Sequence, residues 1–195
     1  MSTKLKVKDL VLIGVFFLIY YALMWIVGLM CIIPILFLCF PAALGIAAGP
    51  TSMLFMAKVP KRWALFIFGI LPHLLNVAMG YHPILLLIAL VFIGIAEFIN
   101  QKSGFKSFKY SAISYALIPA SMSVATMQIL IVRDYYKEIC NRMGEIGPDF
   151  FAKFDAIISW PVVGLVIIGG FLGGIIGAFI GKLMLKKHFE KAGIV

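Results

Sequence analysis

Eight polar or aromatic residues, spread among long apolar runs, are the ones best suited to bind a small molecule. His73 and Asn76 are three residues apart and therefore share one face of a helix. A polar side chain inside a bilayer is costly, so each of them is expected to face the bundle interior and to need a partner. The candidate substrate-binding residues are Trp25, His73, Asn76, Tyr81, His82, Gln128, Arg133 and Trp160. They predict a pocket with aromatic walls, a few orienting polar groups and one cation at its mouth.

The same residues also have purely structural interpretations. His73 fits a helix–helix hydrogen bond, and Arg133 fits an ion pair or a contact to a lipid headgroup. Trp25, Tyr81 and Trp160 fit a belt of aromatic residues at the membrane–water interface. Residue type and spacing alone do not separate a binding pocket from these alternatives.

Motifs for catalysis and nucleotide binding are absent from the sequence. Gly181 and Lys182 lack the upstream glycine and the following hydroxyl residue of a phosphate-binding loop, so we expect no ATP hydrolysis by this chain. Glu97 is the only carboxylate predicted within a span, and one acid does not make an acid–base pair. The three cysteines have no metal-ligand spacing. We therefore predict that the chain is not an enzyme and has no metal or cofactor of its own.

The composition indicates a membrane protein. The chain has 195 residues, of which 63% are apolar and only 13% are charged, against about 25% charged residues in soluble domains. Six spanning helices of about 20 residues would use about 120 residues and leave about 75 for connections. Residues 1–195 are therefore predicted to form a single integral membrane domain. This composition excludes a soluble catalytic domain and a nucleic-acid-binding module.

Six apolar runs are predicted to cross the membrane as an all-α bundle. They cover about residues 10–30, 32–57, 63–79, 83–99, 112–132 and 157–184. The second run carries Pro34, Pro41 and Pro50, so we expect it to be kinked or broken. A long extracytoplasmic connection, about 133–156, is predicted between the fifth and sixth helices. Its aromatic and charged residues fit either a folded lid or a solvated connector.

Basic residues alternate between the predicted connections. The set on one side comprises 13 of the 17 Lys and Arg residues, namely Lys4, Lys6, Lys8, Lys58, Lys61, Arg62, Lys102, Lys106, Lys109, Lys182, Lys186, Lys187 and Lys191. By the positive-inside rule this side is cytoplasmic. An even number of spans also places both termini on one side. We therefore predict a multi-pass protein of the cell membrane with both termini in the cytoplasm.

A stripe of small residues marks the sixth predicted span. Gly169, Gly173, Gly177 and Gly181 recur at every fourth position and so lie on one helix face. Small side chains let a second helix approach closely in lipid. The stripe fits either packing within this chain or docking onto another membrane subunit.

Several stretches together resemble a known family of transport proteins. The basic start running into KLKVKDLVLIGVFFLIYY resembles the first span of the substrate-binding S-component of an energy-coupling factor (ECF) transporter. The stretches IPILFLCFPAALGIAAGPTSMLFMAKVPKR, KSGFKSFKY and GKLMLKKHFEKAGIV are similar, more narrowly, to the Trep-Strep (MptD-like) group. The resemblance covers nearly the whole chain.

The resemblance implies a function and a set of partners. S-components bind a micronutrient at the outer face and then dock on a transmembrane coupling subunit, which two ATPase subunits power. Many carry a pair of small residues on the first span to meet the coupling subunit. The nearest match in this sequence is Gly14 with Leu18, and Leu18 departs from the small-residue pattern.

The cargo and three rival functions stay open. Haem is one candidate cargo, because His73, His82 and the ten methionines offer axial ligands and Arg133 suits a propionate or another carboxylate. The alternative functions are a stand-alone carrier or channel for small molecules and, less favoured, an intramembrane enzyme. A structural membrane subunit without a ligand is a further alternative.

Overall fold

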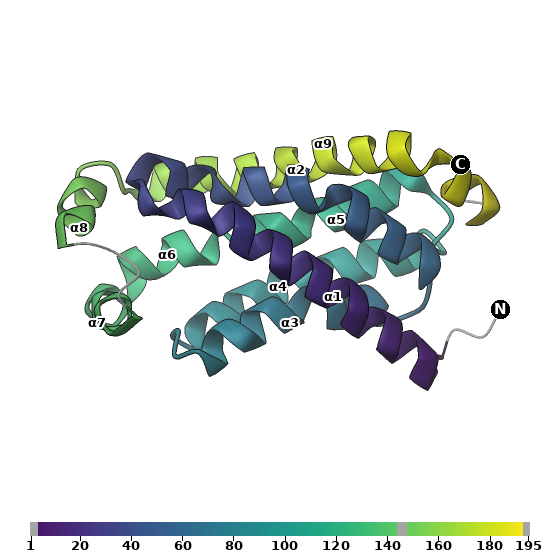
Figure 1. Ribbon diagram of the computed structural model, residues 1–195, viewed down its shortest axis with the longest axis horizontal. Helices are drawn as coiled ribbons and strands as arrows, with labels where there is room; N and C mark the ends of the chain where they lie inside the picture. Colours follow the sequence, from purple (N-terminus) through teal and green to yellow (C-terminus); the bar gives the residue numbers. More distant parts are fainter. Residues whose placement is uncertain (1–3, 144–147, 193–195) are drawn as a thin grey trace.

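The computed structural model describes residues 4–143 and 148–192, and all of the regular structure in these ranges is helical (Figure 1). The helices run in chain order as α1 (Val7–Gly28), the short 3-10 turn η1 (Leu29–Ile32), α2 (Pro34–Lys58), α3 (Ala64–Ala78), α4 (Ile84–Lys102), α5 (Phe108–Ser121), α6 (Val124–Ile131), α7 (Arg133–Met143), α8 (Pro148–Asp155) and α9 (Trp160–Ala192). The predicted all-α fold class is therefore confirmed.

Within the described ranges, five helical segments are long and apolar enough to cross a membrane. They are Val7–Ile32, Pro34–Lys58, Ile84–Lys102, Phe108–Ile131 and Trp160–Lys186. The predicted span at 63–79 corresponds to α3, an apolar helix of only 15 residues. At 1.5 Å per residue α3 is about 22 Å long, less than the roughly 30 Å of a hydrocarbon core.

The helix break falls in a different span from the one expected. Helix α2 runs without interruption through Pro41 and Pro50, and Pro34 occupies its first turn, where a missing N–H costs nothing. Of the two alternatives for the second span, kinked or broken, the break is therefore wrong. The fifth predicted span is divided instead, because α5 ends at Ser121, two residues after Pro119, and α6 begins at Val124.

The glycine stripe packs inside the chain. Helices α2 and α9 lie side by side along much of their length (Figure 1). A Cβ atom added to Gly173 would lie 2.7 Å from Cα of Ala42, and one added to Gly49 would lie 2.5 Å from Cα of Gly177. Real side chains do not approach backbone this closely, so only glycine allows the contact. The interpretation as internal packing is confirmed for this stripe.

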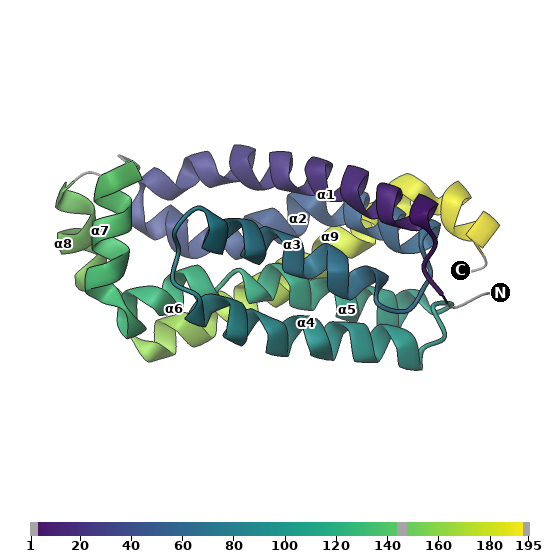
Figure 2. The same cartoon turned by 90° about the horizontal axis from the view of Figure 1, so that it is seen from below.

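The connection between the last two spans is folded. Helices α7 and α8 lie together at one end of the bundle (Figures 1 and 2). We define the cap cluster as the buried residues that join them to α2 and α6, namely Phe37, Ile129, Tyr136, Cys140, Phe151 and Phe154. Arg133 of α7 forms an ion pair with Asp155 of α8, and the Tyr135 hydroxyl donates to the Gly80 carbonyl at 2.6 Å. Residues 133–143 and 148–155 are therefore helical and packed on the bundle, as the alternative of a folded lid predicts, and residues 144–147 of the predicted connection lie outside the described residues.

The opposite end of the bundle carries most of the basic residues. The α2–α3 and α4–α5 connections, the start of α1 and the end of α9 all lie there, away from α7 and α8 (Figure 1). The lysines and arginines of these connections are thus brought to one end, as the alternation in the sequence predicts. The two ends of the molecule differ in charge and in the structure that covers them.

Glu97 has a structural role at this basic end. Its carboxylate accepts hydrogen bonds from the backbone N–H groups of Trp63, at 2.7 Å, and Phe66, at 3.1 Å. The side chain of Gln101 donates a third hydrogen bond at 2.6 Å. An acid from α4 therefore satisfies the free N–H groups that begin α3. This explains how a carboxylate that is 2% exposed is tolerated.

Candidate functional site

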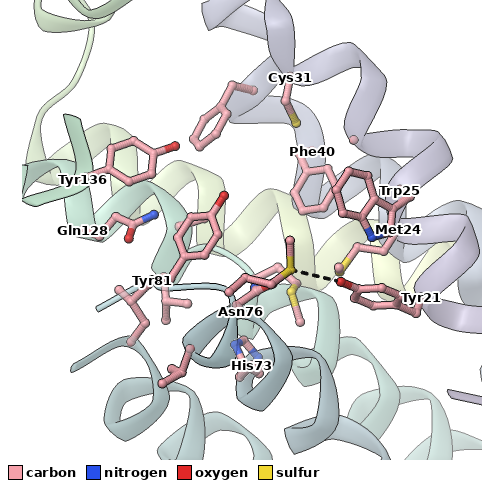
Figure 3. Close-up of a pocket in the computed structure, with 18 of the residues that line it drawn as sticks. Tyr21, Met24, Trp25, Cys31, Phe40, His73, Asn76, Tyr81, Gln128 and Tyr136 are labelled. Carbon is pink, nitrogen blue, oxygen red and sulfur yellow. Dashed lines mark hydrogen bonds between the residues drawn. The ribbon is translucent and has the colours of Figure 1, made fainter. Parts of the chain in front are cut away.

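A cavity of about 340 Å³ lies at the end of the bundle covered by α7. Its volume falls within the roughly 300–1,000 Å³ range of small-molecule sites. Residues from α1, η1, α2 and α3 line it, together with residues around the α5–α6 break and one residue each from α4 and α7 (Figure 3). The break after Pro119 thus opens the interior of the bundle at the level where the cavity lies.

The walls of the cavity are aromatic and rich in sulfur. Aromatic rings come from Tyr21, Trp25, Phe37, Phe40, Tyr81 and Tyr136, and thioethers come from Met24, Met79 and Met122. The Tyr21 hydroxyl donates a hydrogen bond to the Met79 sulfur at 3.5 Å, which joins α1 to the end of α3 (Figure 3). Flat rings on several sides favour a flat, largely apolar guest.

His73 is held in one orientation at the inner side of the cavity. Its Nε2 atom lies 2.9 Å from the Ser121 Oγ atom, and the Ser121 hydroxyl donates to the Ile118 carbonyl at 2.6 Å. Because a serine has one hydroxyl proton, Ser121 must accept from the Nε2–H group of His73. A neutral ring then leaves Nδ1 as a hydrogen-bond acceptor. The serine at the α5–α6 break therefore fixes the tautomer of a cavity residue.

Gln128 of α6 is the least satisfied polar side chain of the cavity. It is 1% exposed, and neither its amide oxygen nor its amide nitrogen has a hydrogen-bond partner in the described part of the chain. In Figure 3 it lies on the side of Tyr81 and Tyr136, across from Tyr21 and Trp25. A buried polar atom without a partner destabilises a fold, so this amide is suited to meet something that enters the cavity.

The structure brings five of the eight predicted binding residues to the cavity. Trp25, His73, Asn76, Tyr81 and Gln128 all line it. They come from four separate segments of the chain, so their convergence depends on the packing of α1, α3 and α6 at this end. Their assignment to ligand binding stays a prediction, whereas their placement around one cavity is observed.

The other three predicted residues do not line the cavity. His82 accepts a hydrogen bond from the Ile84 backbone N–H at its own Nδ1 atom, 3.2 Å away, and its ring packs edge-on against Tyr135. Arg133 forms an ion pair with Asp155. Trp160 begins α9 and is 58% exposed, as expected of an interfacial tryptophan.

Arg133 therefore does not line the cavity as its predicted cation, and its ion pair with Asp155 matches the structural alternative given for it.

The chain matches the family described as hypothetical bacterial integral membrane protein (Trep_Strep) over residues 7–191. It belongs to the Trep_Strep family. The match takes in every described helix that lines the cavity. No curated protein and no solved structure matches the chain. The Trep_Strep chain is therefore an integral, multi-pass membrane protein.

Several cavity residues of this Trep_Strep chain were not predicted from sequence. Tyr21, Met24 and Gly28 lie on the same face of α1 as Trp25. Their spacing in the sequence could therefore have predicted that they line the cavity together with Trp25. Tyr136 belongs to the connection for which a lid was one alternative. Phe37 and Phe40 had no such signal, because phenylalanine is common throughout the apolar runs.

The predicted contact to a coupling subunit lies on the outer side of α1. A Cβ atom added to Gly14 would meet nothing within 4 Å, and Leu18 is 64% exposed. Both positions therefore face away from the rest of the chain. Gly14 leaves a shallow gap on a surface otherwise formed by exposed Val11, Val15 and Leu18.

Proposed function

We propose that this Trep_Strep protein is the substrate-binding S-component of an ECF-type importer. It holds a small micronutrient in the cavity at the outer face of the membrane. It then delivers this cargo through a transmembrane coupling subunit, which two separate ATPase subunits power. The observation that carries the proposal is a ligand-sized cavity at one end of the bundle, beneath a folded cap.

The interior beyond the cavity is filled, which favours a capture protein over an open channel. Tyr20, Phe55 and Phe68 are fully buried there. The ring centres of Tyr20 and Phe68 are 5.3 Å apart, and those of Phe55 and Phe68 are 4.5 Å apart. These packed rings oppose the passage of a cargo from the cavity to the basic end in this arrangement. Release inward then requires a change in the packing or in the position of the whole bundle.

We assign six crossings to the chain, with α3 as the short third one. Helix α2 ends at the basic end and α4 begins at the capped end, so α3 has to connect the two ends (Figure 1). An even number of crossings brings the start of α1 and the end of α9 to the same side. The excess of Lys and Arg at this end supports a cytoplasmic location for it. The cap formed by α7 and α8 is then extracytoplasmic.

The outer surface of α1 is the proposed contact with the coupling subunit. Gly14 and Leu18 lie on a continuous apolar surface that the described part of the chain leaves uncovered. A glycine on such a surface lets a partner helix approach closely. The absence of a phosphate-binding loop from the sequence fits a driving force supplied by partner subunits.

The proposal is tested by isolating the tagged chain from membranes of its own host in mild detergent. We expect a coupling subunit and two ATPase subunits to co-purify with the wild-type chain. Gly14→Trp fills the gap on α1 and should lower their recovery about tenfold, as expected of overpacking at an interface. Gly94→Trp is the matched control, because a Cβ atom at Gly94 on α4 also meets nothing within 4 Å.

Two results would contradict the proposal. One is isolation of the wild-type chain without any ATPase subunit. The other is accumulation of a cargo inside vesicles that contain this chain alone, which would favour a stand-alone carrier. Equal losses from Gly14→Trp and Gly94→Trp would contradict the assignment of the α1 surface.

A further inference from the structure

We infer that the cavity binds an uncharged, planar ligand in which an N–H donor stands beside a C=O acceptor, as in an amide. The side chain of Gln128 forms hydrogen bonds with both groups of this amide-like pair. The inference rests on the proposed function, since it names the class of cargo for the same cavity. Lactams, carboxamides and nitrogen heterocycles with a ring N–H beside a carbonyl belong to this class.

The charge of the lining excludes a strongly ionic guest. Among the described residues that line the cavity, none is an Asp, Glu, Lys or Arg. Arg133, the nearest candidate from sequence, is paired with Asp155. An ionised carboxylate or phosphate brought into this cavity would lose its hydration without gaining a counter-charge, which is costly. The same argument disfavours haem, whose propionates would need a cation.

Gln128 supplies the complementary half of an amide pair. Its side chain offers two N–H donors and one carbonyl acceptor. Both kinds of atom are buried and unpartnered in the described part of the chain. A ligand with a donor beside an acceptor satisfies both at once with two parallel hydrogen bonds. A ligand with only one of the two groups leaves one amide atom of Gln128 unpaired.

The remaining lining residues set the shape of the ligand. Trp25, Phe40 and Tyr81 present rings to the cavity, and stacking on such rings favours a planar guest. Asn76 is half-buried, lines the cavity one helical turn from His73 and has room for a second polar contact. The acceptor Nδ1 left on His73 fits a further donor on the ligand. A flat, neutral molecule with polar groups at its edge matches all of these features.

The test uses a series of three bicyclic probes of nearly equal size. Isoquinolin-1(2H)-one carries the N–H and C=O pair, 2-methylisoquinolin-1-one lacks the donor, and 1-naphthoate carries a negative charge. Binding is measured by equilibrium dialysis with the full-length protein in lipid nanodiscs, with empty nanodiscs subtracted. We expect the N–H lactam to bind about tenfold more tightly than its N-methyl analogue, since the analogue leaves Gln128 unsatisfied. The naphthoate should bind more weakly still.

Partitioning into lipid gives the opposite order, because the N-methyl analogue is the more apolar of the two lactams. A preference for the N–H compound therefore reports a hydrogen-bonded site. Equal binding of both lactams, tighter binding of the naphthoate, or no binding of any probe overturns the inference. Retention of haem by the protein, in preference to the lactam, overturns it as well.

Two variants assign the effect to Gln128. Gln128→Leu keeps the volume but removes the amide, and it should abolish the preference for the N–H lactam. Ser123→Ala is the matched control, because Ser123 is also buried and without a partner in the described part of the chain but does not line the cavity. The control should keep the preference. If Gln128→Leu unfolds at the wild-type temperature or above and still prefers the N–H lactam, the inferred role of Gln128 is wrong.

The outcome is independent of the test of the proposed function. Recovery of ATPase subunits depends on the surface of α1, whereas probe selectivity depends on the interior of the cavity. A protein that co-purifies with its partner subunits but prefers the naphthoate would support the proposed S-component function and contradict only the inferred class of cargo.

Discussion

At the scale of single residues, the polar side chains of this protein fall into two groups. Glu97 and Ser121 have all their hydrogen bonds within the chain and serve to begin a helix or to orient a neighbour. Gln128 has none in the described part of the chain, although it is as deeply buried. Satisfied polar groups contribute to the stability of a fold, whereas an unsatisfied one that also lines a cavity, as Gln128 does, indicates where a ligand or water can bind.

Glu97→Gln tests the structural role of this acid. The substitution replaces one carboxylate oxygen by an NH₂ group, which cannot accept from the N–H groups that begin α3. We expect the free energy of unfolding to fall by about 1–3 kcal/mol. Thermal unfolding in detergent measures the change. Glu138→Gln is the control, since this exposed α7 residue forms a surface ion pair with Arg142, and the loss of that pair should cost about 0.5 kcal/mol or less. Equal effects of the two substitutions would contradict the capping role.

At the scale of helices, close backbone packing determines where α2 and α9 meet. The two helices approach through glycines on both sides, Gly45 and Gly49 against Gly174 and Gly177. In lipid there is little hydrophobic force between helices, so such close contact supplies much of the attraction. It also leaves no room for a side chain at these positions.

Gly177→Ala and Gly164→Ala form a matched pair on the same helix. A Cβ atom at Gly177 would collide with the backbone of Gly45 and Ile46, whereas one at Gly164 would meet nothing within 4 Å. Alanine favours a helix over glycine by about 1 kcal/mol, so Gly164→Ala should be neutral or stabilising. Gly177→Ala should destabilise the protein by about 3 kcal/mol.

Thermal unfolding and size-exclusion chromatography of the two variants measure the difference. The same unfolding temperature for both would show that the α2–α9 contact is looser than the structure indicates. A loss of stability confined to Gly164→Ala would place the important surface of α9 on its outer side.

At the scale of the whole molecule, the two ends of the bundle differ in structure and in charge. The capped end contains the cavity, and the basic end contains the exposed lysines of the α4–α5 connection. We expect the capped end to face outward. Cys140 is fully buried in the cap cluster, so labelling the native cysteine is a poor test of this orientation.

The orientation is tested with single cysteines placed at exposed positions in a variant that lacks the three native ones. Asn141→Cys lies on α7, and Lys106→Cys lies between α4 and α5. A membrane-impermeant maleimide added to intact cells should label Asn141→Cys fully, while Lys106→Cys should react only after the membrane is opened. The reverse pattern would invert the topology and place the cavity on the cytoplasmic side.

The sequence alone determined that the protein is an integral membrane protein built of apolar helices, and it predicted that the basic connections gather on one side. Long apolar runs cross a membrane because backbone groups must be paired within a helix there, and this holds whatever the neighbours are. The alternation of basic residues between the runs likewise depends only on chain order. The presence of His73, Asn76 and Gln128 in apolar runs was enough to indicate a polar site, since such residues are costly in lipid.

Only the tertiary structure decided which of these residues share one cavity and which do not. His82 and Arg133 are close in sequence to cavity residues. Yet His82 accepts a hydrogen bond from Ile84, and Arg133 forms an ion pair with Asp155. The continuity of α2 through Pro41 and Pro50 also depends on packing against neighbouring helices, because the local preference of proline alone predicts a kink or a break there. Burial and partners arise from contacts between segments distant in the chain, so no pattern within one segment contains them.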